Sequence, residues 1–213
     1  PKPFAPETIF IGGGTPTELS DNDFERMLNI LVQSIRRNNL VEWTCESNPG
    51  TLTPAKAALM KEYGINRVSL GVQSFDPRIL EFIGRIHSPE EAVAGYTLLR
   101  EHGISNINLD LMYGIPNASL ETVRSDLHQL IQLNPEHVAC YCLIFEHGTP
   151  LAELRDKGYV NEVDDETELE QYKLVRNLLA QAGYIHYEIS NFAKPARECQ
   201  HNLLYWSNGE YIG

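Results

Sequence analysis

The chain of 213 residues has few cysteines, little positive charge and no long apolar run. Its four cysteines are too few for a disulfide scaffold in a chain of this length, which predicts a reduced, cytoplasmic compartment. Lys and Arg number 17 against 29 Asp and Glu, a formal net charge of -12 with no basic stripe, and this argues against a nucleic-acid partner. No run reaches the roughly 20 apolar residues that a transmembrane helix needs, so only peripheral membrane contact stays open.

Short runs rich in β-branched and aromatic residues alternate with longer amphipathic segments. They predict six strands, over residues 8–11, 41–45, 67–70, 106–109, 137–141 and 184–189. Five helices are expected between these strands: four start after the candidate N-caps Ser20, Thr53, Ser88 and Ser119, and the fifth covers residues 164–182. The spacing fits βα units, which build right-handed parallel sheets. Because no reversal of the alternation is visible, we expect a partial (β/α) barrel, a curved parallel sheet with outer helices, rather than an open doubly wound sheet.

Polar residues follow nearly every predicted strand, at the sheet edge where ligands of parallel α/β folds bind. Glu46, Gln73 and Asp110 come just after the second, third and fourth strands. A single such residue is more often a helix N-cap, but these three precede the predicted caps by several positions. We therefore expect one concave site, whose carboxylates and amides suit the hydroxyl and ammonium groups of a ribose or an amino acid.

Three consecutive glycines end the first strand, in the stretch IFIGGGTP over residues 9–16. Glycine is costly to order, so the run indicates either a tight turn or a ligand that approaches the backbone closely. Bare N–H and C=O groups can meet an ammonium or carboxylate group at hydrogen-bonding distance. A phosphate cradle is the less favoured alternative, because neither G-x-G-x-x-G spacing nor a following Lys is present.

Four stretches together resemble the radical S-adenosylmethionine (SAM) proteins related to oxygen-independent coproporphyrinogen III oxidase: IFIGGGTP, ESNPGTL, NRVSLGVQSFDPRILEFIGRIHS and NINLDLMYGIP. The resemblance implies a partial (β/α) barrel, here over residues 1–190, that holds SAM and a [4Fe–4S] cluster at its top face. It also implies the SAM-binding residues, which are Gly13, Gly14, Thr15, Glu46, Gln73, Arg85 and Asp110. Two interpretations of Arg85 stay open. Its guanidinium either pairs with the SAM carboxylate or is a solvated charge in the turn between two helices.

The chain departs from this family in its cysteines. The C-x-x-x-C-x-x-C run that binds the family's cluster is absent, so we expect the cluster ligands outside this chain, on a first βα unit upstream of Pro1. Cys140-x-Cys142 has the wrong spacing and is interpreted as a pair of buried small hydrophobic residues. A zinc site that combines this pair with Cys199-x-His201 is a less favoured alternative. Since the family's iron anchors the SAM amino-acid part, SAM affinity of the chain alone should be weak.

The stretch HNLLYW lies in residues 191–213, predicted as the start of a C-terminal extension. It resembles the H-N-x-x-Y-W motif of the family's heme chaperone branch, which implies heme binding and delivery to an acceptor protein. His201 is then a candidate heme ligand, or a residue that only packs beside Tyr205 and Trp206. The alternative function is that of the oxidase branch, SAM-dependent oxidative decarboxylation of coproporphyrinogen III in porphyrin biosynthesis. An unrelated (β/α) enzyme is the third alternative, and the heme acceptor and oligomeric state stay open.

Overall fold

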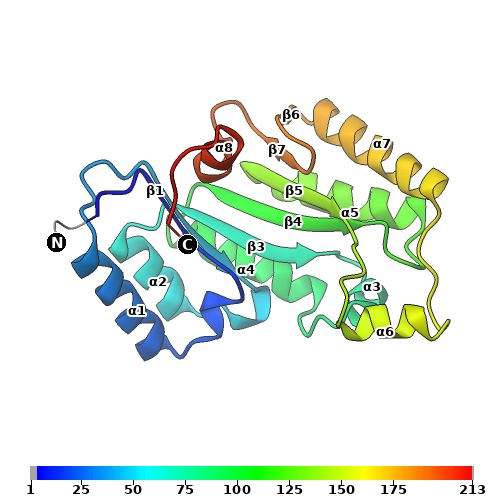
Figure 1. Ribbon diagram of the computed structural model, residues 1–213, viewed down its shortest axis with the longest axis horizontal. Coiled ribbons are helices and arrows are strands. Elements are labelled where there is room, and N and C mark those ends of the chain that lie inside the picture. The colour runs from blue at the N-terminus through cyan, green and yellow to red at the C-terminus, as the bar shows by residue number, and fades with distance from the viewer. Residues whose placement is uncertain (1–3, 213) are drawn as a thin grey trace.

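Figure 1 shows the computed structural model, which describes residues 4–212, as a curved sheet with helices packed on it. The sheet has seven strands in the order β1-β2-β3-β4-β5-β7-β6. Their bounds are β1 Thr8–Ile11, β2 Glu42–Ser47, β3 Arg67–Gln73, β4 Ile107–Tyr113, β5 His137–Cys142, β6 Ile185–His186 and β7 Asn191–Ala193. β1 to β5 pair in parallel and in chain order. The predicted fold class, a partial (β/α) barrel with a curved and mostly parallel sheet, is confirmed.

The described part of the chain contains the five predicted helices, together with three short ones that were not predicted. Their bounds are α1 Asp21–Ser34, α2 Pro54–Tyr63, α3 Pro77–Phe82, α4 Pro89–Glu101, α5 Leu120–Leu133, α6 Pro150–Asp156, α7 Asp165–Gln181 and α8 Gln200–Trp206, with 3-10 turns η1 Pro16–Glu18 and η2 Pro49–Thr51. The predicted N-caps Ser20, Thr53, Ser88 and Ser119 each accept a hydrogen bond from a backbone N–H of the first turn, and Asp164 proves to be the N-cap of α7. At six or seven residues, α3, α6 and α8 are too short to show an apolar period. Across residues 4–212, no helix has both the length and the apolar character to cross a bilayer.

Alternate side chains of the strands separate an apolar outer face from a polar inner face. Trp43, Cys45, Val68 and Leu109 are buried in the hydrophobic core. Helices α1, α2, α4 and α5 cover this outer face (Figure 1). The residues that alternate with them are polar: Glu42, Thr44 and Glu46 in β2, Arg67 and Ser69 in β3, Asn108 and Asp110 in β4. Parallel sheets usually carry apolar side chains on both faces, so the polar inner face is unusual and is the side on which we look for a functional site.

The prediction of a sixth parallel strand over residues 184–189 is wrong. Only β6 is extended there; it pairs antiparallel with β7, and β7 pairs antiparallel with β5. The reason is a local turn, in which Ser190 N donates to Glu188 Oε1 at 3.1 Å and His186 Nε2 lies 3.1 Å from Ile189 O. This turn reverses the chain, and a hairpin forms instead of a βα unit. The domain boundary after residue 190 stays a prediction, and β7 is part of the sheet.

The segment after β7 returns to the sheet and lies beside β1 as helix α8 (Figure 1). Buried Glu42 of β2 accepts hydrogen bonds from Gln200 N and His201 N, both at 3.0 Å, and from Cys199 Sγ at 3.3 Å. A carboxylate is well placed here, because the first N–H groups of a helix have no partner within the helix. Glu42 thereby fixes α8 over the end of the inner face where the strands begin.

Candidate functional site

A polar cavity of about 150 Å³ lies where the parallel strands end. Its lining residues come from β2, β3, β4 and three loops: Gly14, Thr15, Glu46, Ser47, Asn48, Ser69, Gly71, Gln73, Arg85 and Asp110. The structure therefore brings together six of the seven residues predicted to bind SAM, and the seventh, Gly13, contacts Glu46 from the neighbouring loop. That these residues share one site is an observation. Their binding of SAM stays a prediction.

The glycine run after β1 packs against the carboxylate of Glu46. A Cβ on Gly12 would lie 2.7 Å from Glu46 Cδ and 2.8 Å from Phe10 Cε1, so no side chain fits there. Gly13 has a φ of +83°, which residues with a Cβ rarely adopt, and its N–H lowers the pKa of the Glu46 carboxyl group. Gly14 lines the cavity, and a Cβ on it would meet nothing within 4 Å. Gly13 and Gly14 thus both face space that a ligand can take, and only Gly12 is closed in by its neighbours.

Asn48 joins two of the cavity's loops to Arg85. Its Nδ2 donates to Thr15 Oγ1 at 2.8 Å, and its Oδ1 accepts from Arg85 Nη1 at 3.3 Å. The guanidinium of Arg85 is therefore held at the cavity rather than solvated between helices, and its other N–H groups can meet a carboxylate. Asn48 is absent from the predicted set, although it stands in the stretch ESNPGTL. It occupies an N-cap position, but its side chain makes no capping bond and reaches Thr15 instead.

Two acidic side chains, Asp110 and Glu46, give the cavity its charge. Asp110 accepts hydrogen bonds from Asn108 Nδ2 at 2.5 Å and from Ser69 Oγ at 3.3 Å. Burial raises the pKa of Asp110 to about 6, even though these bonds and the positive charge of Arg67 lower it. Burial also raises the pKa of Glu46, and the Gly13 N–H lowers it. Such paired carboxyl groups with raised pKa values are typical of a ligand site.

Gln73 ends β3 in a left-handed backbone conformation, with a φ of +68°. This is rare for a residue with a Cβ and is found where the surroundings enforce it, often at functional sites. The Gln73 Oε1 accepts a hydrogen bond from Tyr141 Oη at 2.8 Å. The next residue, Ser74, donates through Oγ to Asp126 of α5 at 2.6 Å. Tyr141 was not a predicted site residue, and its only sequence signal is its place near the end of a predicted strand.

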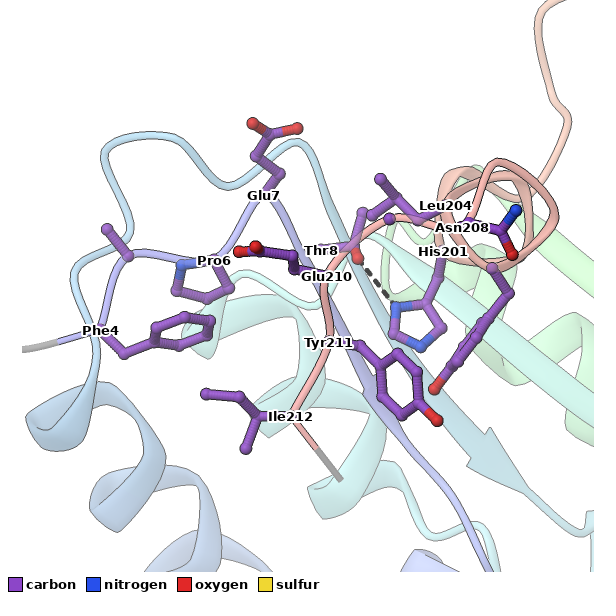
Figure 2. A pocket seen from close by; sticks show the side chains of 13 residues that line it. Phe4, Pro6, Glu7, Thr8, His201, Leu204, Asn208, Glu210, Tyr211 and Ile212 are labelled. Atoms are coloured by element: carbon purple, nitrogen blue, oxygen red, sulfur yellow. Dashed lines mark hydrogen bonds between the residues drawn. The ribbon is translucent and has the colours of Figure 1, made fainter.

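His201 lies away from this cavity, in α8. Its Nδ1 is 2.8 Å from Thr8 Oγ1, and its ring stacks on Phe10 with ring centroids 5.3 Å apart. It lines a second cavity of about 830 Å³, between residues 4–8 and 201–212 (Figure 2). Much of that wall is apolar or aromatic: Phe4, Pro6, Leu204, Tyr205, Tyr211 and Ile212. Burial lowers the pKa of His201, so its imidazole is neutral at neutral pH.

The cysteines do not form a metal site in the described part of the chain. Cys140 is in the hydrophobic core with Cys142 packed against it, which confirms their interpretation as hydrophobic residues. Cys199 Sγ contacts Glu42 instead. Within residues 4–212 no group of three or more His, Cys, Asp or Glu side chains could hold a metal ion, so the zinc alternative is wrong. These residues do not fit a [4Fe–4S] cluster either, and cluster ligands outside this chain stay a prediction.

A curved parallel sheet whose strand ends converge on a polar cavity is an architecture that several α/β families share, the radical SAM proteins among them. The sequence profile of the Radical SAM superfamily matches residues 2–130, which is more than half of the chain. The chain therefore belongs to the radical SAM superfamily, as predicted.

Comparison with individual named proteins is more specific than the superfamily match. The chain is 39% identical over 208 residues to "Heme chaperone HemW" of Bacillus subtilis and 41% identical over 207 residues to the protein of that name in Escherichia coli. These matches cover 97% of this chain but only 55% and 54% of the two proteins, so the chain spans about half their length. This similarity agrees with the resemblance of HNLLYW to the heme chaperone branch.

Solved structures share the fold. The coproporphyrinogen III oxidase HemN of Escherichia coli matches with a TM-score of 0.80 and 23% identity, over 95% of this chain and 46% of that one. The archaeal Methanocaldococcus infernus Elp3 matches with a TM-score of 0.67 and 23% identity, over 79% of this chain and 44% of that one. At this level of identity, the two likenesses show the fold alone.

Proposed function

We propose that the protein to which this chain belongs binds heme and transfers it to an acceptor protein, with SAM and a [4Fe–4S] cluster bound in the whole protein. The HemW relatives support this function. The observation that carries it is the position of the His201 imidazole on the wall of a large cavity that apolar and aromatic side chains also line. A reduced cytoplasmic compartment is part of the same proposal, supported by the four free thiols of the chain.

The second cavity has two features that suit heme binding, a candidate axial ligand and aromatic side chains on its wall. Figure 2 shows the His201 ring held on Thr8, with the ring of Tyr211 beside it. When the Nδ1–H donates to Thr8 Oγ1, Nε2 keeps its lone pair, and such a hydrogen bond orients an imidazole ligand and raises its basicity. The aromatic rings of Phe4, Tyr205 and Tyr211 suit the flat apolar face of a porphyrin.

The cavity at the strand ends is proposed to take one end of SAM. Its donor set fits: Glu46 and Asp110 for ammonium and ribose hydroxyl groups, Arg85 for the carboxylate. The remaining proposed contacts are Gly13, Gly14, Thr15 and Gln73. The cavity is too small for the whole molecule, and a further cavity of about 220 Å³ adjoins it at Asn48 and Arg85. A bound cluster would anchor the methionyl end of SAM through iron, and the residues described here supply none of its ligands.

The experiment is a heme titration of the full-length protein, followed by absorbance, beside an assay for protoporphyrinogen formation from coproporphyrinogen. We expect saturable heme binding, passage of the heme to an acceptor such as an apo-hemoprotein, and no decarboxylation. Turnover of coproporphyrinogen would contradict the chaperone function and favour the oxidase alternative.

Replacing His201 by alanine should weaken heme binding about tenfold and shift the Soret band, because an axial nitrogen ligand is lost. The matched control is His128→Ala, which removes an exposed imidazole on α5. The control should bind heme like the unsubstituted protein. If both variants keep the affinity and the Soret band, His201 is not the ligand.

SAM affinity should rise between pH 5 and pH 7, with a midpoint near the pKa of Asp110, about 6. The ionised carboxyl group attracts an ammonium or hydroxyl group, and the protonated one does not. For the free protein the sign is opposite: this pKa is higher in the folded than in the unfolded state, so the contribution of Asp110 to stability falls as pH rises from 3.8 to about 6. Calorimetric titrations with SAM and thermal unfolding across this range measure both trends. An affinity that is flat or falls with pH would contradict the assignment of Asp110.

A further inference from the structure

Lys56 occupies a position that two general rules disfavour. It is the third residue of α2, where a positive charge opposes the helix macrodipole, and only 6% of its surface is exposed. Lysine is almost never fully buried without partners, because removing its charge from water is costly. The position therefore needs specific contacts that offset both costs.

The partners of Lys56 come from two loops beside the cavity at the strand ends. Its Nζ donates to Thr17 O at 2.6 Å and to Thr51 O at 3.0 Å, and the Asp21 carboxylate is 3.7 Å away. Thr17 belongs to η1, directly after the glycine run, and Thr51 belongs to η2, after β2. One buried ammonium group thus joins the loop after β1 to the loop after β2.

A layer of hydroxyl groups carries this link on to the cavity. Thr17 Oγ1 is 2.6 Å from Thr51 Oγ1 and 3.3 Å from Ser47 Oγ. Thr51 Oγ1 also donates to Asn48 O at 3.1 Å, and Asn48 holds Thr15 and Arg85 through its side chain. The chain of contacts from Lys56 therefore ends on three residues that line the cavity.

We propose that Lys56 is a positioning residue for SAM binding. It fixes residues 12–18 against residues 47–51, so that Thr15, Asn48 and Arg85 keep their mutual contacts before a ligand arrives. Preorganisation of this kind raises affinity, because the ligand does not have to order the loops. The inference rests on the proposed function of the cavity as a SAM site.

The test compares Lys56→Met with Lys61→Met in the full-length, cluster-reconstituted protein. Methionine keeps a long unbranched stem but donates no hydrogen bond. Lys61 is the matched control, because it lies on the same helix and also donates to a carbonyl, Gly103 O at 3.0 Å, but at the surface. The readouts are SAM affinity by calorimetry and amide hydrogen exchange of the free protein. We expect Lys56→Met to weaken SAM binding about tenfold and to speed exchange in residues 12–18 and 47–51, and Lys61→Met to change neither.

A milder variant, Lys56→Gln, keeps an N–H donor and decides the question if Lys56→Met does not fold. Its SAM affinity should lie between that of the unsubstituted protein and that expected for Lys56→Met. Unchanged SAM affinity, or exchange that rises equally throughout β3, β4 and β5, would overturn the inference and leave Lys56 a stabilising residue only. If the unsubstituted protein does not bind SAM, the proposed function fails, whereas exchange confined to the two loops still shows that Lys56 positions them.

Discussion

Replacing Asp110 by asparagine should weaken SAM binding about thirtyfold, or about 2 kcal/mol, while leaving the unfolding temperature unchanged or higher. The two effects have opposite signs because the carboxylate is held partly out of water, with its pKa raised to about 6 by burial. Asparagine removes the cost of that buried charge from the folded protein. It also removes the charge that pairs with SAM. Calorimetry gives the affinity, and thermal unfolding gives the stability.

Two comparisons make this prediction specific. Ser69→Ala removes a hydrogen bond to Asp110 of 3.3 Å but leaves the charge, so it should cost only a few-fold in affinity. The rise in affinity around pH 6 should disappear in Asp110→Asn and persist in Ser69→Ala. Unchanged SAM affinity in Asp110→Asn would remove Asp110 from the site, whatever the stability shows.

The sequence predicts well those parts of the fold that are decided by residues close together along the chain. A capping side chain such as Ser88 and the apolar period that follows it lie within one helix, and the structure confirms each cap. The shared cavity of Glu46, Gln73 and Asp110 follows from topology, since parallel strands end at the same edge of a sheet. The sixth strand is different. Its residues have strand character, but a turn at Glu188 to Ser190 decides how they pair.

The missed site residues depend on contacts between distant segments. Asn48 meets Thr15 across 33 positions, and Tyr141 meets Gln73 across 68. A single sequence holds no local signal for either pair. Asn48 also looks like an ordinary helix cap until its side chain is seen to point elsewhere.

The inner face of the sheet connects the surroundings of Asp110 with those of His201. Asn108 Nδ2 donates to Asp110, so its Oδ1 is left to accept from His137 Nδ1, 2.6 Å away. Burial lowers the pKa of His137 far below its usual value, so the ring is neutral and its Nε2 accepts from Tyr187 Oη at 2.7 Å. Tyr187 Oη in turn accepts from Cys199 N at 3.3 Å, just before α8. A continuous chain of hydrogen bonds, in which every donor has an acceptor, therefore joins β4 to the segment that carries His201.

Replacing Gly114 by alanine should lower the free energy of unfolding by about 3 kcal/mol, the sum of a left-handed backbone cost and an overpacking cost. Gly114 follows β4 with a φ of +69°, and a Cβ there would overlap Cys142 Sγ in β5. The residue cannot move away easily, because its N–H donates to Gln171 Oε1 of α7 at 2.8 Å. Urea unfolding of the full-length protein measures the loss.

Gly148→Ala separates the two costs. Gly148 has a φ of +84°, but a Cβ there would meet nothing within 4 Å, so this variant should lose only the backbone cost, about 1 to 2 kcal/mol. Adding Cys142→Ala to Gly114→Ala removes the overlapping sulfur, and a double-mutant cycle should return a coupling energy of about 1 kcal/mol or more. Equal losses in the two glycine variants would show that β4 and β5 have room at this point. If the double variant loses less stability than the two single variants together, the end of β4, three residues beyond Asp110, is held against β5 by contact rather than by backbone geometry alone.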